Sequence, residues 1–276
     1  GFASVNEIAL APALAAARPS QALADFEAAV LAVTGRSIDP AWYYADRLRV
    51  EARDAGYDPE DIGRLFKLLR KSRFSPTPYY ALVLADGDGM GEAIAQLHGH
   101  DDHRDLSRRM AGFARKVRAT FNGSADGFFG KAVYAGGDDV LAVFPLDGVL
   151  SGVDRIATFF KDEVPGHSIS AGIVIAHMLE PFDRVRQWAQ DAERMAKTWR
   201  RRRDGGAGAV AIRLQKRSGE PRSIVGWLPG EGGGMVDALA QARELFRAGT
   251  LSEGTPYDLI RCSRDVPDVA RLSLAR

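Results

Sequence analysis

Apolar residues recur at helical spacing from residue 5 to residue 71, which predicts a series of helices. The pattern runs through Ala22–Val33, Trp42–Val50 and Ile62–Leu69. Asp39-Pro40 and Asp58-Pro59 each place a capping carboxylate before a proline at the first helical position. Ser75-Pro76-Thr77-Pro78 then forms a stiff break, because each proline disfavours helix at the residue before it. We therefore predict a helical domain over residues 1–75.

After this break, apolar runs of strand length alternate with amphipathic helical segments. The expected strands are Tyr79–Ala85, Lys131–Tyr134, Val140–Phe144, Ser168–Ala176 and Ala209–Leu214, with 221–228 as a further edge strand. The expected helices are Gly91–Leu97, Leu106–Phe121, Val149–Phe160 and Phe182–Arg200. The core order βαββαβ predicts an α+β, ferredoxin-like domain over 76–229, with an antiparallel sheet and two helices on one face. On the last helix, we expect Phe182, Trp188 and Met195 to form the core face.

A glycine-rich join at Gly230–Gly234 separates this domain from the final residues. Met235–Phe246 and Tyr257–Cys262 have helical patterns, so 230–276 is predicted to begin a C-terminal helical domain. The start, Gly1-Phe2-Ala3-Ser4, has no Met and no basic region and looks like the cut edge of a longer protein.

Composition narrows the class of protein. The chain has 276 residues, 46% of them hydrophobic, and a net charge of +1. This is ordinary for a globular protein, so any nucleic-acid contact must come from local patches of charge. The single cysteine, Cys262, excludes an internal disulfide framework or a Cys-rich zinc site. No apolar run is long enough to span a membrane, and a cytoplasmic location is expected.

Carboxylates fall at the ends of two strands that the predicted topology makes neighbours. Asp86 ends the first strand, and Asp138 and Asp139 lie in the Gly-Gly-Asp-Asp turn between the second and third strands. Three carboxylates at one edge repel one another unless cations neutralise them. Oxygen ligands suit Mg²⁺ or Mn²⁺, and two such ions can activate a hydroxyl and stabilise a leaving phosphate oxygen. The pattern predicts a polymerase-type palm; the alternative is that both motifs are surface turns.

Glycines surround these carboxylates and leave room for phosphates near the backbone. Gly136 and Gly137 permit positive φ, and the helix that follows Asp86 begins in a glycine-rich turn whose N–H groups could hold a triphosphate. The predicted nucleotide-binding residues are Gly87, Asp88, Gly89, Met90, Gly91, Gly136, Gly137 and Ser170. The Gly87 carbonyl is a further candidate metal ligand. Ser170 and His177 could equally be ordinary strand residues.

The segments Tyr79–Glu92, His103–Ser107, Val133–Ala142 and Ser170–His177 resemble the large subunit of type III CRISPR–Cas effector complexes. This is the Cas-ten family, and the details are most similar to its Cmr (III-B) branch. The resemblance implies a palm that condenses ATP into cyclic oligoadenylate second messengers for antiviral defence. It also implies other effector subunits as partners, and crRNA and target RNA bound through the complex. A second palm would come from a longer protein or from another copy in a palm–palm dimer.

The related diguanylate cyclases have a helix motif similar to Ala189–Lys197, whose final lysine reaches the triphosphate, and this implies the same role for Lys197. This chain departs from the signature of the diguanylate cyclases, because Val140 follows the paired aspartates. The family's HD nuclease domain, first palm and zinc-binding element are not visible in this sequence. His100-Asp101 lacks the surrounding histidines of a nuclease.

Several residues have a plainer reading beside the functional one. Lys197 could be a solvated lysine near a helix end. The run Trp199–Arg203 could hold phosphates or RNA, or be a solvated helix end that the helix dipole favours. His98, His100 and His103 read as solvated loop residues. Two other functions also stay open, namely a non-catalytic scaffold or RNA-binding palm, and a synthase of a different cyclic mono- or dinucleotide.

Overall fold

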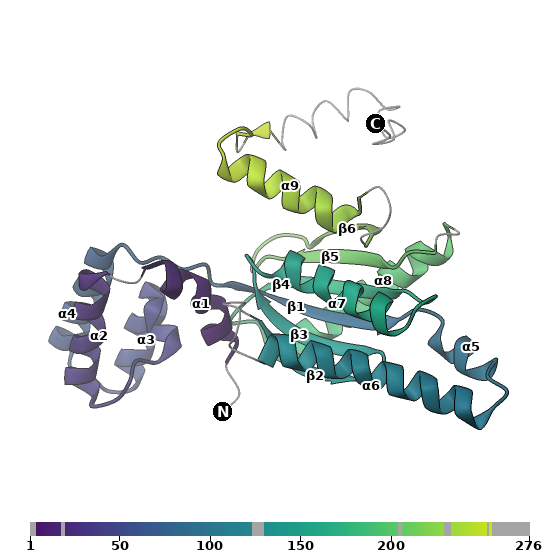
Figure 1. The fold of residues 1–276 in the computed structure, drawn as a ribbon. Helices are drawn as coiled ribbons and strands as arrows, with labels where there is room; N and C mark the ends of the chain where they lie inside the picture. The colour runs from purple at the N-terminus through teal and green to yellow at the C-terminus, as the bar shows by residue number, and fades with distance from the viewer. Residues whose placement is uncertain are drawn as a thin grey trace.

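The computed structural model describes residues 4–17, 20–122, 130–203, 206–228, 233–252 and 254–255. Its N-terminal helices lie to one side of a mixed sheet (Figure 1). They are α1 (Val5–Ala17), α2 (Gln21–Thr34), the 3₁₀ turn η1 (Pro40–Tyr43), α3 (Ala45–Asp54) and α4 (Pro59–Ser72). Both predicted caps are confirmed, because the Asp39 carboxylate accepts the Ala41 N–H at 2.8 Å and the Asp58 carboxylate accepts the Glu60 N–H at 2.7 Å. The single helix expected from Trp42 is divided between η1 and α3.

The first helix packs against two different cores. Leu10 joins Phe26 and Leu48 in the core of the helical segment. Ile8 and Ala9, two residues and one residue earlier, pack instead with Leu82 and Val143 of the sheet. Because one helix serves both cores, the helical segment and the sheet are in direct contact.

The sheet has the order β2-β3-β1-β4-β5-β6. Its strands are β1 (Tyr79–Gly87), β2 (Lys131–Gly136), β3 (Asp139–Pro145), β4 (Ile169–His177), β5 (Ala209–Gln215) and β6 (Arg222–Trp227). β1 is antiparallel to both β3 and β4, which confirms the ferredoxin-like core. β5 joins β4 in parallel, since the long helix between them carries the chain back across the sheet. β6 pairs with β5 as the predicted edge strand.

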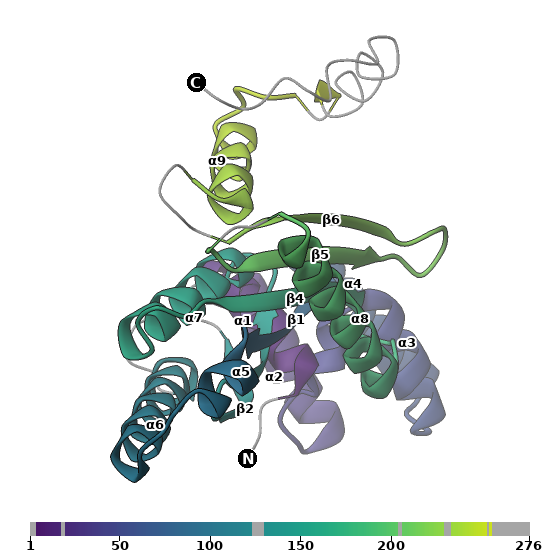
Figure 2. The ribbon, with the colours of Figure 1, turned by 90° about the vertical axis from the view of Figure 1, so that its right-hand side faces the viewer.

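Helices cover both faces of this sheet (Figure 2). They are α5 (Met90–Ala95), α6 (His100–Asn122), α7 (Val149–Glu163), α8 (Phe182–Arg201) and α9 (Met235–Arg247). Ala81 and Val83 of β1 point into the core that α6 and α7 cover, where Phe113 and Phe160 meet edge to face with ring centroids 5.0 Å apart. Tyr80 and Leu82 point to the opposite face, under α8 and α1. The second C-terminal helix predicted at Tyr257–Cys262 lies outside the described residues, as do Gly230–Gly232.

The expected core face of α8 is wrong in part. Phe182 and Met195 are 38% and 42% exposed, and Trp188 is half-buried. The buried residues are instead Val185, Ala189, Ala192 and Ala196. Small side chains let the helix backbone approach the sheet closely, and at the closest point β4 has Gly172. A Cβ atom there would lie 2.5 Å from the Ala189 carbonyl oxygen and nearer still to the Glu193 amide nitrogen. Large apolar residues would hold the helix too far away.

Gly172→Ala is therefore expected to push α8 from the sheet and to destabilise the fold by about 1–3 kcal/mol, the usual cost of overpacking. Chemical denaturation of both proteins would measure the change. Gly63→Ala in α4 is the control, because a Cβ at Gly63 meets nothing within 4 Å. Equal stability of Gly172→Ala and Gly63→Ala would show that α8 does not depend on this contact.

Candidate functional site

Two of the predicted carboxylates lie where neighbouring strands end and begin, Asp86 near the end of β1 and Asp139 at the start of β3. The β1–β3 ladder runs to the pair Ala85 and Val140, so Asp86 and Asp139 are the next residues of each strand at one edge of the sheet. Gly137 makes the preceding turn possible, because its φ of 62° is unfavourable for residues with a side chain. Gly136 has a different role, since a Cβ there would meet the Tyr134 ring, with its Cζ at 2.9 Å.

Asp138 lies against the end of β1. A Cβ on Gly87 would come within 2.9 Å of both the Cβ and the Oδ2 of Asp138, and within 2.6 Å of the Met90 side chain. Gly87 thus lets the paired-aspartate turn approach the backbone that follows Asp86. Burial raises the pKa of Asp138, as does the charge of Asp139, and burial also raises the pKa of Asp139. Both shifts mean that the charged forms of these carboxylates are disfavoured here, chiefly because burial removes them from water.

Helix α8 brings a cation to the same place. The Lys197 ammonium forms an ion pair with the Asp86 carboxylate and a second one with Glu193 at 3.1 Å. Burial lowers the pKa of Lys197 to about 8, and the nearby guanidinium groups of Arg201 and Arg200 act in the same direction. Lys197 is only 19% exposed, so it is not the solvated lysine of the plainer reading.

Asp88 is held within the protein. Its carboxylate accepts hydrogen bonds from the Ser168 hydroxyl at 2.7 Å and the Ser170 hydroxyl at 2.8 Å, and Arg200 lies 3.4 Å away. Only 1% of the Asp88 side chain is exposed. Ser170 also accepts the Ala209 N–H at 3.1 Å. This network ties the turn after β1 to β4, β5 and the end of α8. It gives Asp88 and Ser170, both expected to bind nucleotide, a role in positioning the turn.

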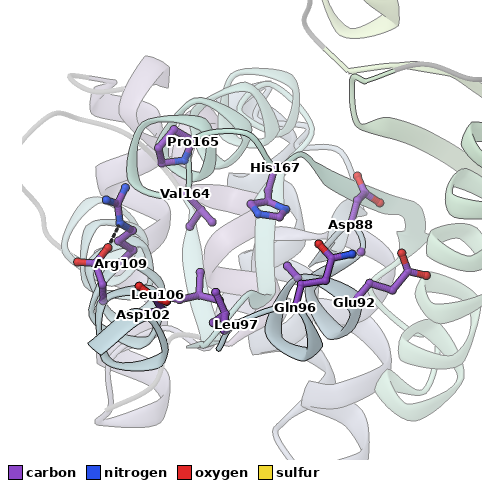
Figure 3. Close-up of a pocket in the computed structure, with 13 residues that line it drawn as sticks. Asp88, Glu92, Gln96, Leu97, Asp102, Leu106, Arg109, Val164, Pro165 and His167 are labelled. Carbon is purple, nitrogen blue, oxygen red and sulfur yellow. Dashed lines mark hydrogen bonds and ion pairs between the residues drawn. The ribbon is translucent and has the colours of Figure 1, made fainter. Parts of the chain in front are cut away.

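A pocket of about 630 Å³ opens beside this turn (Figure 3). Its lining comes from the Asp88-Gly89 turn, α5, the first half of α6 and the loop before β4. Glu92, Leu106 and His167 represent three of these elements. Gly89 has a φ of 71° where α5 begins, and Gly91 faces open space. Met90 is buried in the core, so it anchors α5 and does not line the pocket.

Three residues of this region escaped the sequence reasoning. Glu193 holds Lys197 from one turn earlier in α8, and burial together with Asp88 raises its pKa. Arg200 was part of a run read as solvated or phosphate-binding, yet it contacts Asp88 and donates to the Ala207 carbonyl at 3.0 Å. Ser168 is the third. The helical spacing of Glu193, Lys197 and Arg200 was the available signal, because residues four and seven apart share one side of a helix.

Other expected residues lie elsewhere. His177 is opposite Tyr79 in the β1–β4 ladder, whereas Asp86 is opposite Ser170. Seven residues of strand separate Tyr79 from Asp86, about 23 Å, so His177 is remote from the carboxylate edge. His98, His100 and His103 start or precede α6. In the part of the chain that the structure describes, they join no cluster of three or more groups able to hold a metal.

The oxygen donors of Asp86, Asp138 and Asp139 are of the kind that divalent metals prefer, but these carboxylates do not form a ready coordination site. Among the described residues, no three His, Cys, Asp or Glu groups converge as a ready metal cluster. Mg²⁺ commonly takes one or two protein carboxylates and completes its shell with water and substrate phosphates. Asp86, Asp138 and Asp139 supply such donors, and a cation at Asp86 is already represented by the Lys197 ammonium.

Comparison with known proteins finds that part of this sequence is similar to one family. Residues 79–205 match the sequence model of the family described as Cas10/Cmr2, second palm domain. The CRISPR system Cmr subunit Cmr2 of Pyrococcus furiosus is 32% identical over 187 residues, which are 55% of this chain and 20% of that protein.

Solved structures of Csm1 are also similar. A Csm1–Csm4 cassette in complex with pppApA has a TM-score of 0.41 and 19% identity, covering 51% of this chain and 21% of that one. Csm1 of T. onnurineus has a TM-score of 0.39 and 18% identity, covering 51% and 22%. The chain thus spans about a fifth of the length of the relatives that it matches.

Proposed function

We propose that this chain is the nucleotidyltransferase part of a type III CRISPR effector subunit, because residues 79–205 match the sequence model of the second palm domain of the Cas10/Cmr2 family. Its substrate is ATP and its product is cyclic oligoadenylate. The observation that supports this most directly is the meeting of Asp86, Asp139 and Lys197 at one edge of the sheet, with Asp138 against Gly87. A scaffold has no physical need for such a concentration of charge.

In the proposed reaction, the 3′-hydroxyl of an acceptor adenosine attacks the α-phosphate of a donor ATP, and pyrophosphate leaves. Two divalent cations held by Asp86, Asp138, Asp139 and the Gly87 carbonyl would supply charge neutralisation and hydroxyl activation. Lys197 binds the triphosphate, and the open space at Gly91 leaves room for its oxygens. The pocket beside Gly89 receives the donor nucleoside. The protein contributes mainly by positioning these groups.

The acceptor must also be held, and a second palm would provide its site, either elsewhere in a longer protein or in another copy of this chain. We place the activity in a cytoplasmic complex with other effector subunits, where crRNA and target RNA act as the trigger. Within the described residues, no helix combines the length and hydropathy that crossing a membrane requires.

The test is to incubate the chain, with its complex partners and target RNA, with ATP and Mn²⁺ and to identify products by mass spectrometry. Cyclic oligoadenylates are expected. Cyclic mono- or dinucleotides would replace this proposal with a different cyclase. Absence of any product, while RNA still binds, would favour the non-catalytic scaffold.

Nucleotide binding should depend on pH through Lys197. Its pKa of about 8 in the free protein means that the ammonium is lost as pH rises through 8, so affinity for the triphosphate should fall by pH 9.5. Lys197→Arg keeps its charge throughout this range, so its affinity should change less. Dissociation constants for ATP with Mg²⁺, measured from pH 7 to 9.5, would show this difference. Identical pH profiles for the two proteins would contradict a phosphate-binding role for Lys197.

A further inference from the structure

Positive charge is concentrated in one part of the chain. Residues 182–228 contain twelve Lys and Arg and five Asp and Glu, a net charge of +7 in a chain whose total is +1. This segment is α8, β5 and β6, which lie side by side (Figure 2). The remaining residues are therefore net acidic, and the molecule has a marked asymmetry of charge that attracts polyanions to one side.

Much of this charge has no carboxylate partner among the residues that the structure describes. Arg201, Arg202, Arg203, Lys216, Arg217 and Arg222 are all exposed. None of the ion pairs formed among the described residues involves any of these six side chains. By contrast, Lys197 and Arg200 of the same helix are engaged with Asp86 and Asp88. Among the described residues, Arg202 and Arg203 at the end of α8 thus form no ion pair with the carboxylates that hold Lys197 and Arg200.

Tryptophans lie along the same surface. Trp188 and Trp199 are eleven residues apart in α8, which is about three turns and about 16 Å, so they share one side of the helix. The Arg213 guanidinium lies 5.2 Å from the Trp188 ring centroid, and that of Arg203 lies 4.2 Å from the Trp199 ring. Trp227 of β6 packs edge to face on Trp199, with centroids 4.6 Å apart. All three rings are only half-buried, so aromatic faces alternate with guanidinium groups. We call these five residues, with Arg202, the Trp–Arg surface.

The geometry points to the Trp–Arg surface as a binding site for single-stranded nucleic acid. Bases stack on half-exposed tryptophan faces and on guanidinium planes, while the unpaired arginines contact phosphates. An acidic protein would use the charges but has no need of a row of indoles at this spacing. This site is separate from the carboxylate edge and does not depend on the proposed nucleotidyltransferase activity.

The test measures binding of fluorescein-labelled U₁₂ RNA and T₁₂ DNA to the full chain by anisotropy at several salt concentrations. The double variant Arg202→Glu, Arg203→Glu should weaken binding about tenfold or more and flatten its salt dependence. The matched control is Arg64→Glu, Lys67→Glu, two exposed cations of α4 with the same change of charge. That control should bind nearly as the parent does. Tighter binding of one oligonucleotide would identify the kind of nucleic acid.

Trp199→Leu separates stacking from charge, because it retains an apolar side chain and removes the aromatic face. It should weaken binding about tenfold at unchanged salt dependence, provided that circular dichroism shows the parent fold. Asp138→Asn should bind the oligonucleotides as the parent does, since the carboxylate edge is not involved. Equal losses in the two double variants, or full affinity in folded Trp199→Leu, would overturn the proposal. So would polyglutamate competing as well as RNA, because this would indicate an acidic protein partner.

Discussion

Asp138→Asn combined with Asp139→Asn is expected to reduce oligoadenylate synthesis at least about a thousandfold, since each residue is proposed to hold metal at the reacting phosphate. The same change should leave the free protein at least as stable as before. Burial and mutual repulsion raise the pKa of these carboxylates, so their charged forms oppose folding near neutral pH, and neutral amides relieve that repulsion.

The measurement pairs product yield by mass spectrometry with chemical denaturation. Glu60→Gln combined with Asp61→Asn, a neighbouring acidic pair in the first turn of α4, is the matched control. It should leave product yield unchanged and lower stability by about 1 kcal/mol, because these charges interact favourably with the helix dipole. Activity that survives in the Asp138 and Asp139 variant would remove these residues from the reaction. Lost activity with lost stability would instead mean that they serve the fold.

Asp88→Ala is expected to have the largest effect on stability, about 3–5 kcal/mol, because it removes the acceptor at the centre of a buried network. The hydroxyls of Ser168 and Ser170 lose their shared partner, and Arg200 is left with the Ala207 carbonyl. Thermal and urea unfolding would measure the loss. Asp191→Ala, which breaks an exposed pair with Arg194, should cost less than about 1 kcal/mol.

A double-mutant cycle distinguishes positioning from general damage. If Asp88 and Arg200 act together, Arg200→Ala should cost much less in the Asp88→Ala background than in the parent protein. Strictly additive losses would show that the two side chains are independent. A stable Asp88→Ala protein with weakened ATP binding would restore the nucleotide-contact role that the sequence suggested.

Hydrophobic periodicity predicted the sheet well because the residues on each face of a strand match the environment of that face. β1 alternates between the core under α6 and α7 and the core under α8, and both cores are apolar, so Tyr79–Ala85 reads as a continuous run. The hairpin at Gly137 was predictable for a different reason, since few residues other than glycine tolerate its φ of 62°. Both the strand and the turn could therefore be predicted from the local sequence.

Side-chain roles were harder to predict, because they depend on distances across the fold. Asp86 and Asp88 stand two residues apart in one acidic turn, yet the first pairs with Lys197 and the second is buried under Ser168, Ser170 and Arg200. Nothing in the turn itself distinguishes them. Similarly, the bulky residues of α8 were predicted to form its core face. The close approach at Gly172 of β4 requires small side chains there, so alanines form the buried face instead.

The double packing of α1 limits how far this protein can be divided. Ile8 and Ala9 cover part of the sheet beside Leu82 and Val143, although more than sixty residues and an entire helical core intervene in the chain. A fragment trimmed to begin at Tyr79 would expose that apolar patch to water. The part of the chain that forms the sheet is consequently not self-contained, and grafting it into another protein would require a substitute for the first helix.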